Sequence, residues 1–165
     1  MNKNKLHAQS SAQSKLRLDD QLCFALYAAT NAVTRAYRSL LEPLGLTYPQ
    51  YLVMMSLWQH GTQQMSRIAE RLQLDNHAIT PLVDRLENAG LVRRHRGESD
   101  RRVIFIELTT AGGALEAAAS VVQRSVVCRT ELEPHALAAL REELKALVHR
   151  MEPELVHTQQ EDRDR

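Results

Sequence analysis

The chain has 165 residues, of which 44% are hydrophobic, so it can bury one core of ordinary size. It carries 21 basic and 20 acidic residues, which excludes a global electrostatic attraction to nucleic acid or membranes; any attraction must come from a local cluster. No apolar run is long enough to span a bilayer, and the first residues lack the apolar middle of a secretory signal. We therefore expect a cytoplasmic protein with two free cysteines and no membrane partner.

The first elements are a basic arm and a long helix. Residues 1–17 contain four basic side chains and no acidic one, which predicts a flexible arm. Apolar residues then recur every three or four positions as far as residue 44, which predicts a helix that Asp19 or Asp20 caps and that Gly45 closes.

Three shorter helices are predicted next. Thr47 and Gln50 have the spacing of a capping box and open a helix through about residue 58. After a turn at residues 60–61, helical patterns cover 66–72 and 75–89, and the second ends before a glycine. The last two helices form a helix-turn-helix.

Two strand-like runs, 91–96 and 102–108, follow the helix-turn-helix and predict a β-hairpin. Further helices are expected from Thr109 or Thr110 to about residue 129 and from residue 134 to 151. This order predicts a mainly α (α+β) fold, a winged helix-turn-helix with N- and C-terminal dimerisation helices.

The hairpin carries the local charge cluster that DNA binding requires. Five arginines oppose two carboxylates between residues 91 and 102, which leaves a net charge of +3 (five minus two). The arginines are Arg93, Arg94, Arg96, Arg101 and Arg102, and the carboxylates are Glu98 and Asp100. A charged hairpin can also serve solubility alone, but after a helix-turn-helix this charge favours double-stranded DNA as the partner.

The helix over 75–89 is the predicted recognition helix. Its packed face is Ile79, Leu82, Val83 and Leu86, which leaves Asn76, His77, Thr80, Asp84 and Arg85 facing outward. The first three can reach base edges in the major groove. Pro81 is expected to bend the helix, because it removes one backbone hydrogen bond.

The helices on either side of the DNA-binding region have surplus apolar surface. We assign 47–109 to DNA binding, 18–46 and 110–153 to a helical dimerisation region, and 154–165 to a charged tail. A homodimer would bury the surplus and place two recognition helices on a near-palindromic operator. An intramolecular helical bundle is the alternative.

The residues alone do not decide whether Cys23 packs or reacts. The start of a helix favours a thiolate, whereas the neighbouring carboxylates oppose it. An enzyme is not indicated, because the chain has no Cys-x-x-Cys and no phosphate-binding glycine loop. The seven histidines lack the spacing of metal ligands, so neither a metal nor another cofactor is expected.

Three stretches resemble one known family. "LVRRHRGESDRRVIFIELTTAG" (91–112) is similar to the wing of the MarR-type winged-helix regulators, with Arg94, Asp100 and Arg102 at matching positions. "LDDQLCFALYAATNAVTRAYRSLLEPLGLTYPQYLVMMSLW" (18–58) and "DNHAITPLVDRL" (75–86) resemble the organic-hydroperoxide-sensing branch, of the two-cysteine type.

The resemblance implies a dimeric repressor that an organic hydroperoxide inactivates. Cys23 would be the reacting thiol, Tyr37 and Tyr48 the tyrosines that hydrogen-bond it, and Cys128 the thiol that closes a disulfide across the dimer. The alternative is a regulator of the same fold that responds to a small phenolic or apolar ligand without thiol chemistry.

Overall fold

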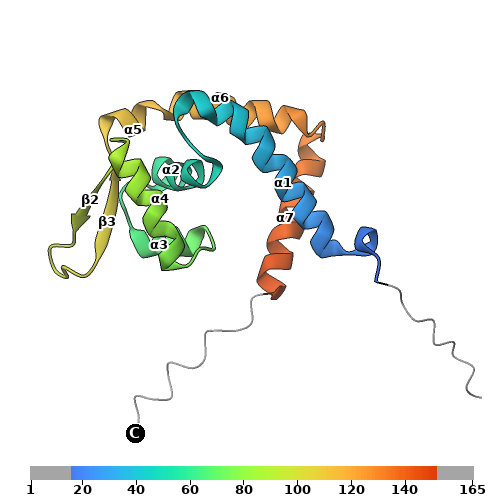
Figure 1. Cartoon of the computed structure of the whole chain (residues 1–165), viewed down its shortest axis with the longest axis horizontal. Helices are drawn as coiled ribbons and strands as arrows, with labels where there is room; N and C mark the ends of the chain where they lie inside the picture. Colours follow the sequence, from blue (N-terminus) through green and yellow to red (C-terminus); the bar gives the residue numbers. More distant parts are fainter. Residues whose placement is uncertain (1–15, 152–165) are drawn as a thin grey trace, which may run out of the picture. The chain divides into compact units, whose positions relative to one another are not determined.

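A computed structural model describes residues 16–151; residues 1–15 of the predicted arm and all of the predicted tail lie outside this range. The α-helices are α1 (Leu22–Leu41), α2 (Tyr48–His60), α3 (Met65–Arg71), α4 (Asn76–Asn88), α5 (Thr110–Ala114), α6 (Glu116–Arg129) and α7 (Pro134–Met151). The strands are β1 (Gln63–Gln64), β2 (Val92–Arg96) and β3 (Ile104–Leu108), and short 3-10 helices cover Leu18–Asp20 and Glu42–Leu44 (Figure 1). The predicted mainly α, winged helix-turn-helix class is confirmed. The chain divides into two compact units, one ending at Ala114 and one starting at Leu115.

The start of α1 differs from the prediction. Asp19 and Asp20 lie in the preceding 3-10 turn, and the helix begins after Gln21, with no side-chain cap. The Asp20 carboxylate instead pairs with Arg17 at 3.4 Å. At the other end α1 stops at Leu41, and the 3-10 turn carries the chain to Gly45, whose φ of 67° is the predicted left-handed stop.

The capping box of α2 is confirmed. The Thr47 backbone N–H donates to Gln50 Oε1 at 2.8 Å, and the Gln50 backbone is capped by the Thr47 side chain. Most residues between Gln50 and Leu57 are buried, and Val53, Met54 and Leu57 have no exposed surface. Helix α2 is therefore the centre of the first unit's core.

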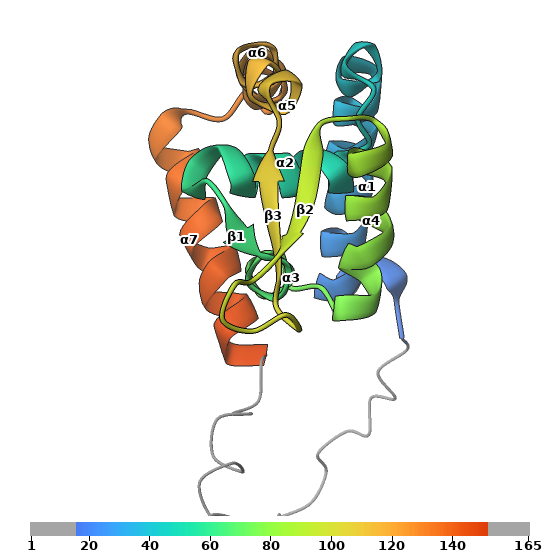
Figure 2. The ribbon, with the colours of Figure 1, turned by 90° about the vertical axis from the view of Figure 1, so that its left-hand side faces the viewer.

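Helices α3 and α4 and the hairpin pack around α2, as the views in Figures 1 and 2 agree. Ile68 of α3, Ile79 of α4 and Ile106 of β3 are fully buried. Strand β3 is central in an antiparallel sheet of order β1-β3-β2 (Figure 2). The sequence did not predict β1, because its two glutamines carry no strand signal and owe their conformation to pairing with Phe105 and Ile106.

The helix predicted from Thr109 to about residue 129 is two helices. Thr109 caps α5 as expected, because its Oγ1 accepts from the Gly112 N–H at 3.0 Å. The helix is then interrupted at Leu115, and α6 begins at the next residue. Gly112 packs so closely that a Cβ there would meet the Leu91 carbonyl oxygen at 2.0 Å, which fixes α5 against the start of β2.

The second unit contains α6 and α7, with α7 covering the predicted range. None of the α7 residues is buried, and Leu140, Leu144 and Val148 are well exposed. Among residues 16–151, no helix is long and apolar enough to cross a membrane.

Candidate nucleic-acid interface and redox cysteines

Helix α4 presents the predicted recognition face. Its inner side buries Ile79, Val83 and Leu86, with Leu82 half-buried, as the periodicity predicted. Asn76, His77 and Arg85 are exposed on the other side. Thr80 is half-buried, and its hydroxyl donates to the Asn76 carbonyl at 2.9 Å, which satisfies it within the helix. Pro81 lies inside α4, one turn from the helix start.

The wing's exposed arginines lie at its far end. Arg96 ends β2, and Arg101 and Arg102 lie in the turn before β3; all three are exposed. Asp100 supports this turn, because its carboxylate accepts from the Arg102 backbone N–H at 2.9 Å. The tip therefore carries three cationic side chains on a backbone held by a local hydrogen bond.

The other two wing arginines are paired with carboxylates. Arg93 donates to both carboxylate oxygens of its cross-strand partner Glu107, at 3.0 and 3.1 Å. This pair lowers the pKa of Glu107. Arg94 turns toward α4, where its Nη1 lies 2.6 Å from Asp84 and 3.4 Å from Glu87. Of the five wing arginines, the three that form no ion pair within residues 16–151 thus lie at the tip, together with the carboxylates of Glu98 and Asp100.

Tyr37 and Tyr48, the two tyrosines predicted to hydrogen-bond the thiol, lie side by side, and Tyr51 lies with them. The ring centroids of Tyr37 lie 4.7 Å from Tyr48 and 5.4 Å from Tyr51. Burial, with smaller effects of Tyr51 and Tyr48, raises the pKa of Tyr37 from 10.0 to about 12. Burial also raises the pKa of Tyr48. These phenols therefore remain protonated at neutral pH and can act as hydrogen-bond donors.

Cys23 does not lie within reach of Tyr37 of its own chain. It is exposed in the first turn of α1, whereas Tyr37 is 14 positions (37 minus 23) further along the same helix. At a rise of 1.5 Å per residue this separation is about 21 Å, far beyond hydrogen-bonding reach. Cys128 is exposed near the end of α6, in the second unit.

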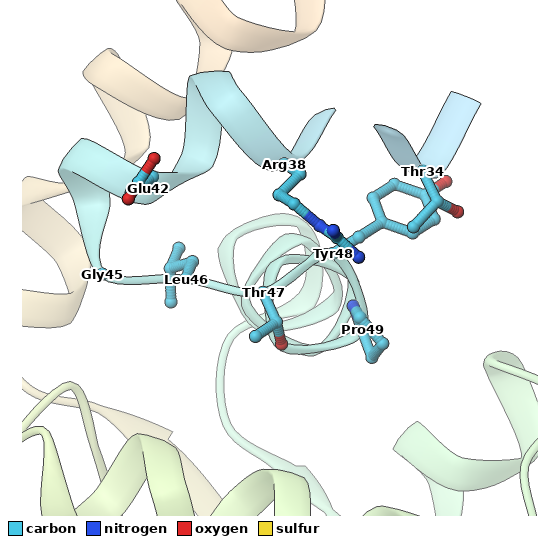
Figure 3. A pocket seen from close by; sticks show the side chains of 8 residues that line it. All are labelled: Thr34, Arg38, Glu42, Gly45, Leu46, Thr47, Tyr48 and Pro49. Carbon is cyan, nitrogen blue, oxygen red and sulfur yellow. The ribbon is translucent and has the colours of Figure 1, made fainter. Parts of the chain in front are cut away.

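A cavity of about 530 Å³ lies beside Tyr48 at the junction of α1 and α2. Figure 3 shows Thr34 and Arg38 of α1 facing this space together with Tyr48 and Pro49 of α2. Glu42, Gly45, Leu46 and Thr47 complete its wall. The cavity therefore adjoins the tyrosine cluster and is lined partly by a cationic side chain.

Several residues near these sites were not predicted. Glu87 and Glu107 hold the two paired arginines, and the half-buried Trp58 donates from Nε1 to the Gly112 carbonyl at 3.0 Å. Glu107 follows from the hairpin register, since it lies opposite Arg93. The contacts of Glu87 and Trp58 join distant parts of the sequence and have no local signal. No group of side chains within residues 16–151 has the arrangement of a metal site.

Comparison with known proteins gives a consistent picture. The model of the MarR family matches residues 46–104. An organic hydroperoxide resistance transcriptional regulator of Bacillus subtilis is 36% identical over 133 residues, 81% of this chain and 90% of that protein. The HTH-type transcriptional regulator TtmR of Methylorubrum extorquens is 42% identical over 146 residues, 84% of this chain and 75% of that protein.

Solved structures of AbfR from Staphylococcus epidermidis are similar to this chain in three states. Reduced AbfR bound to DNA has a TM-score of 0.72 at 32% identity, covering 85% of this chain and 99% of that one. Overoxidised AbfR bound to DNA gives 0.70 at 33%, covering 84% and 98%. Disulfide-formed AbfR gives 0.60 at 34%, covering 82% and 96%. With relatives above 30% identity along most of their length, the chain belongs to the MarR family of transcriptional regulators.

Proposed function

We propose that this MarR-family regulator is a repressor that binds operator DNA as a homodimer and releases it when an organic hydroperoxide oxidises Cys23. The observation that carries the proposal is the geometry of α1, which has an exposed thiol at its start and, near its end, Tyr37, which lies against Tyr48 and Tyr51 of α2. The Cys23 thiol cannot contact Tyr37 within one chain, but it could contact the Tyr37 of a second chain.

The DNA-binding half of the proposal is supported by α4 and the wing. Asn76 and His77 are exposed at the start of α4, where side chains of a recognition helix reach base edges. Arg96, Arg101 and Arg102 at the wing tip suit phosphates or a narrow minor groove. The similar AbfR has been solved in complex with DNA in its reduced form.

The homodimer is supported by the separation of about 21 Å along α1. If Tyr37 and Tyr48 hydrogen-bond the thiol, as the resemblance implies, they must come from a second copy. Two α1 helices running in opposite directions across a two-fold axis bring each Cys23 to the partner's tyrosine cluster. The exposed Leu22 and Val33 on the same helix gain an apolar partner in this arrangement.

The chemistry begins with attack of the Cys23 thiolate on the peroxide O–O bond. The sulfur takes the terminal oxygen and becomes a sulfenic acid, while the alkoxide leaves and is protonated to the alcohol. Tyr37 and Tyr48 are protonated at neutral pH, as tyrosines ordinarily are, and burial raises their pKa values further, so their hydroxyls can donate to the thiolate. The hydroperoxide is the oxidant, and each molecule removes two electrons from the thiol.

Cys128 completes the switch by attacking the sulfenic acid of the partner's Cys23. A disulfide forms, water leaves, and the sulfur is spared irreversible oxidation. A bond between sulfurs requires their Cα atoms within about 7 Å, so closing it requires the two helices to approach. The same movement would separate the two recognition helices from their half-sites. The similar AbfR is known in a disulfide form, and its overoxidised form is bound to DNA. We therefore assign release to the disulfide.

The test is a DNA-shift titration with and without cumene hydroperoxide, on a duplex that the reduced wild type selects from a random pool. Wild type should release DNA upon oxidation, and dithiothreitol should restore binding. Cys23→Ser should bind with unchanged affinity and ignore the peroxide. Release from Cys23→Ser at the same peroxide dose would locate the sensor elsewhere.

The cavity beside Tyr48 favours a second candidate, a regulator that responds to a small phenolic ligand. Arg38 and Tyr48 would offer a cation and an aromatic face to such a molecule. Release of DNA by a phenol such as salicylate from the Cys23→Ser variant, in excess reductant, would support this candidate. Release that needs both peroxide and Cys23 favours the redox sensor.

A further inference from the structure

Arg94 lies in β2, but its side chain and its backbone N–H contact residues of α4. Its Nη1 lies 2.6 Å from Asp84 Oδ1 and 3.4 Å from Glu87 Oε2. Its Nη2 donates to the Thr80 carbonyl at 3.3 Å, and its backbone N–H donates to Glu87 Oε1 at 3.0 Å. One residue of β2 thus joins the wing to α4 through four contacts.

The register of the sheet explains why Arg94 points inward. Its cross-strand partner is Ile106, which has no exposed surface, and partners in an antiparallel pair share a face of the sheet. Arg94 therefore lies on the face toward α4. The neighbouring Arg93 lies on the opposite face, where its side chain is 66% exposed against 25% for Arg94.

The electrostatics also distinguish Arg94 from a phosphate-binding side chain. Arg94 with Asp84 and Glu87 carries a net charge of −1 (one positive minus two negatives). Its Nε is buried without a hydrogen-bond partner, so the guanidinium is held by its ion pairs rather than directed at solvent. Contact with a phosphate would break these pairs and leave two carboxylates of α4 uncompensated beside DNA.

We propose that Arg94 is a positioning residue, which sets the wing against the recognition helix, and that the ionic contacts with DNA come from Arg96, Arg101 and Arg102. These three are exposed, and none forms an ion pair with another residue in the range 16–151. The inference rests on the proposed DNA binding and divides its arginines into two classes.

The two classes differ in the salt dependence of binding. Affinity falls as salt rises, and each ionic contact with a phosphate makes the slope of log K against log salt concentration steeper by about 0.9. Removing a phosphate-binding arginine must therefore flatten the slope by about one per wing. Removing a positioning residue weakens binding without changing the number of counterions released.

The experiment measures fluorescence anisotropy of the wild-type-selected duplex over a range of salt concentrations. It compares full-length Arg94→Gln with the matched control Arg102→Gln, which removes the same charge from the tip. We expect Arg102→Gln to flatten the slope by about one per wing. Arg94→Gln should bind about tenfold more weakly but keep the wild-type slope. Equal flattening in both variants, or unchanged affinity in Arg94→Gln, would overturn the inference.

Asp84→Asn provides a second test that does not remove Arg94. Simple electrostatics predicts tighter DNA binding, because a negative charge near the phosphates is lost. If Arg94 positions the wing, Asp84→Asn should weaken binding, because the wing loses the shortest of its four contacts with α4. Tighter binding by Asp84→Asn would contradict the proposal even if Arg94→Gln failed to fold. Failure of the wild type itself to bind any duplex would instead overturn the proposed function.

Discussion

The winged helix-turn-helix, residues 47–109, and the helices on either side of it place their apolar side chains in opposite environments. Within 47–109, Met55 is the one large apolar side chain that is well exposed. The flanking helices expose many more: Leu22, Tyr27, Val33, Val121, Val127, Leu140, Leu144, Val148 and Met151. The winged helix-turn-helix thus buries its apolar side chains within a single chain, whereas the flanking helices leave apolar surface that a second copy could cover.

The largest effect should come from opening the core of the winged helix-turn-helix. Leu86 has no exposed surface, so Leu86→Ala should lower the free energy of unfolding by about 2–5 kcal/mol through lost burial and a cavity. Urea denaturation at two protein concentrations should give the same loss. Met55→Ala, at the one well-exposed large apolar side chain of the same region, is the control and should cost far less. Comparable losses of stability in the two variants would contradict the difference between buried and exposed apolar side chains.

The flanking helices should carry the redox response. In Cys128→Ser, peroxide should no longer reduce DNA affinity by the roughly hundredfold, about 2.7 kcal/mol, that we expect of wild type. On a non-reducing denaturing gel, oxidised wild type should run as a dimer that reductant converts to monomer, and the variant should remain monomeric with Cys23 overoxidised. Oxidised wild type that runs as a monomer with both thiols consumed would place the disulfide within one chain.

Dimer affinity should depend on the exposed apolar face of α7. Leu144→Lys should raise the dimer dissociation constant by about tenfold or more, because burying a leucine stabilises an interface whereas burying an unpaired lysine destabilises it. The matched control is Glu142→Lys, which places its lysine about 160° away around the helix. Sedimentation velocity measures both. If the two variants dissociate equally, this face of α7 is not an interface.

The smallest effect should come from the capping box that opens α2. Thr47→Ala removes the side chain that caps the Gln50 backbone, so it should cost about 1 kcal/mol of stability. Because Thr47 also lies beside Tyr48, thermal unfolding and peroxide sensitivity should be measured on the same sample. Loss of stability with an intact peroxide response would separate the helix cap from the sensor.

Sequence reasoning succeeded where the signal is local. The capping box at Thr47, the stops at Gly45 and Gly90, and the period of α4 each depend on neighbours within one or two turns, and each is confirmed. The predicted cap at Asp19 or Asp20 was wrong, since the chain makes a 3-10 turn there. The break at Leu115 was missed, although two adjacent glycines precede it.

The exposure of the candidate site residues was largely predictable from the sequence, whereas their contacts were not. Exposure of Asn76 and His77 follows from helical periodicity, and the hairpin register pairs Arg93 with Glu107. The turn of Arg94 toward α4 requires the angle at which a strand packs on a helix, which no spacing encodes. The meeting of Tyr37 with Tyr48 likewise depends on how the chain reverses between α1 and α2.

Trp58 makes the junction between α2 and α5 directly observable. It is the only tryptophan in the sequence, its indole N–H is bonded to Gly112, and its ring lies 6.3 Å from that of Tyr51. Light absorbed by the tyrosine cluster therefore passes by energy transfer to an indole at the base of the wing. Any change that separates α5 from α2 should alter the emission of that indole, so the unlabelled protein carries its own fluorescent probe next to the tyrosine cluster.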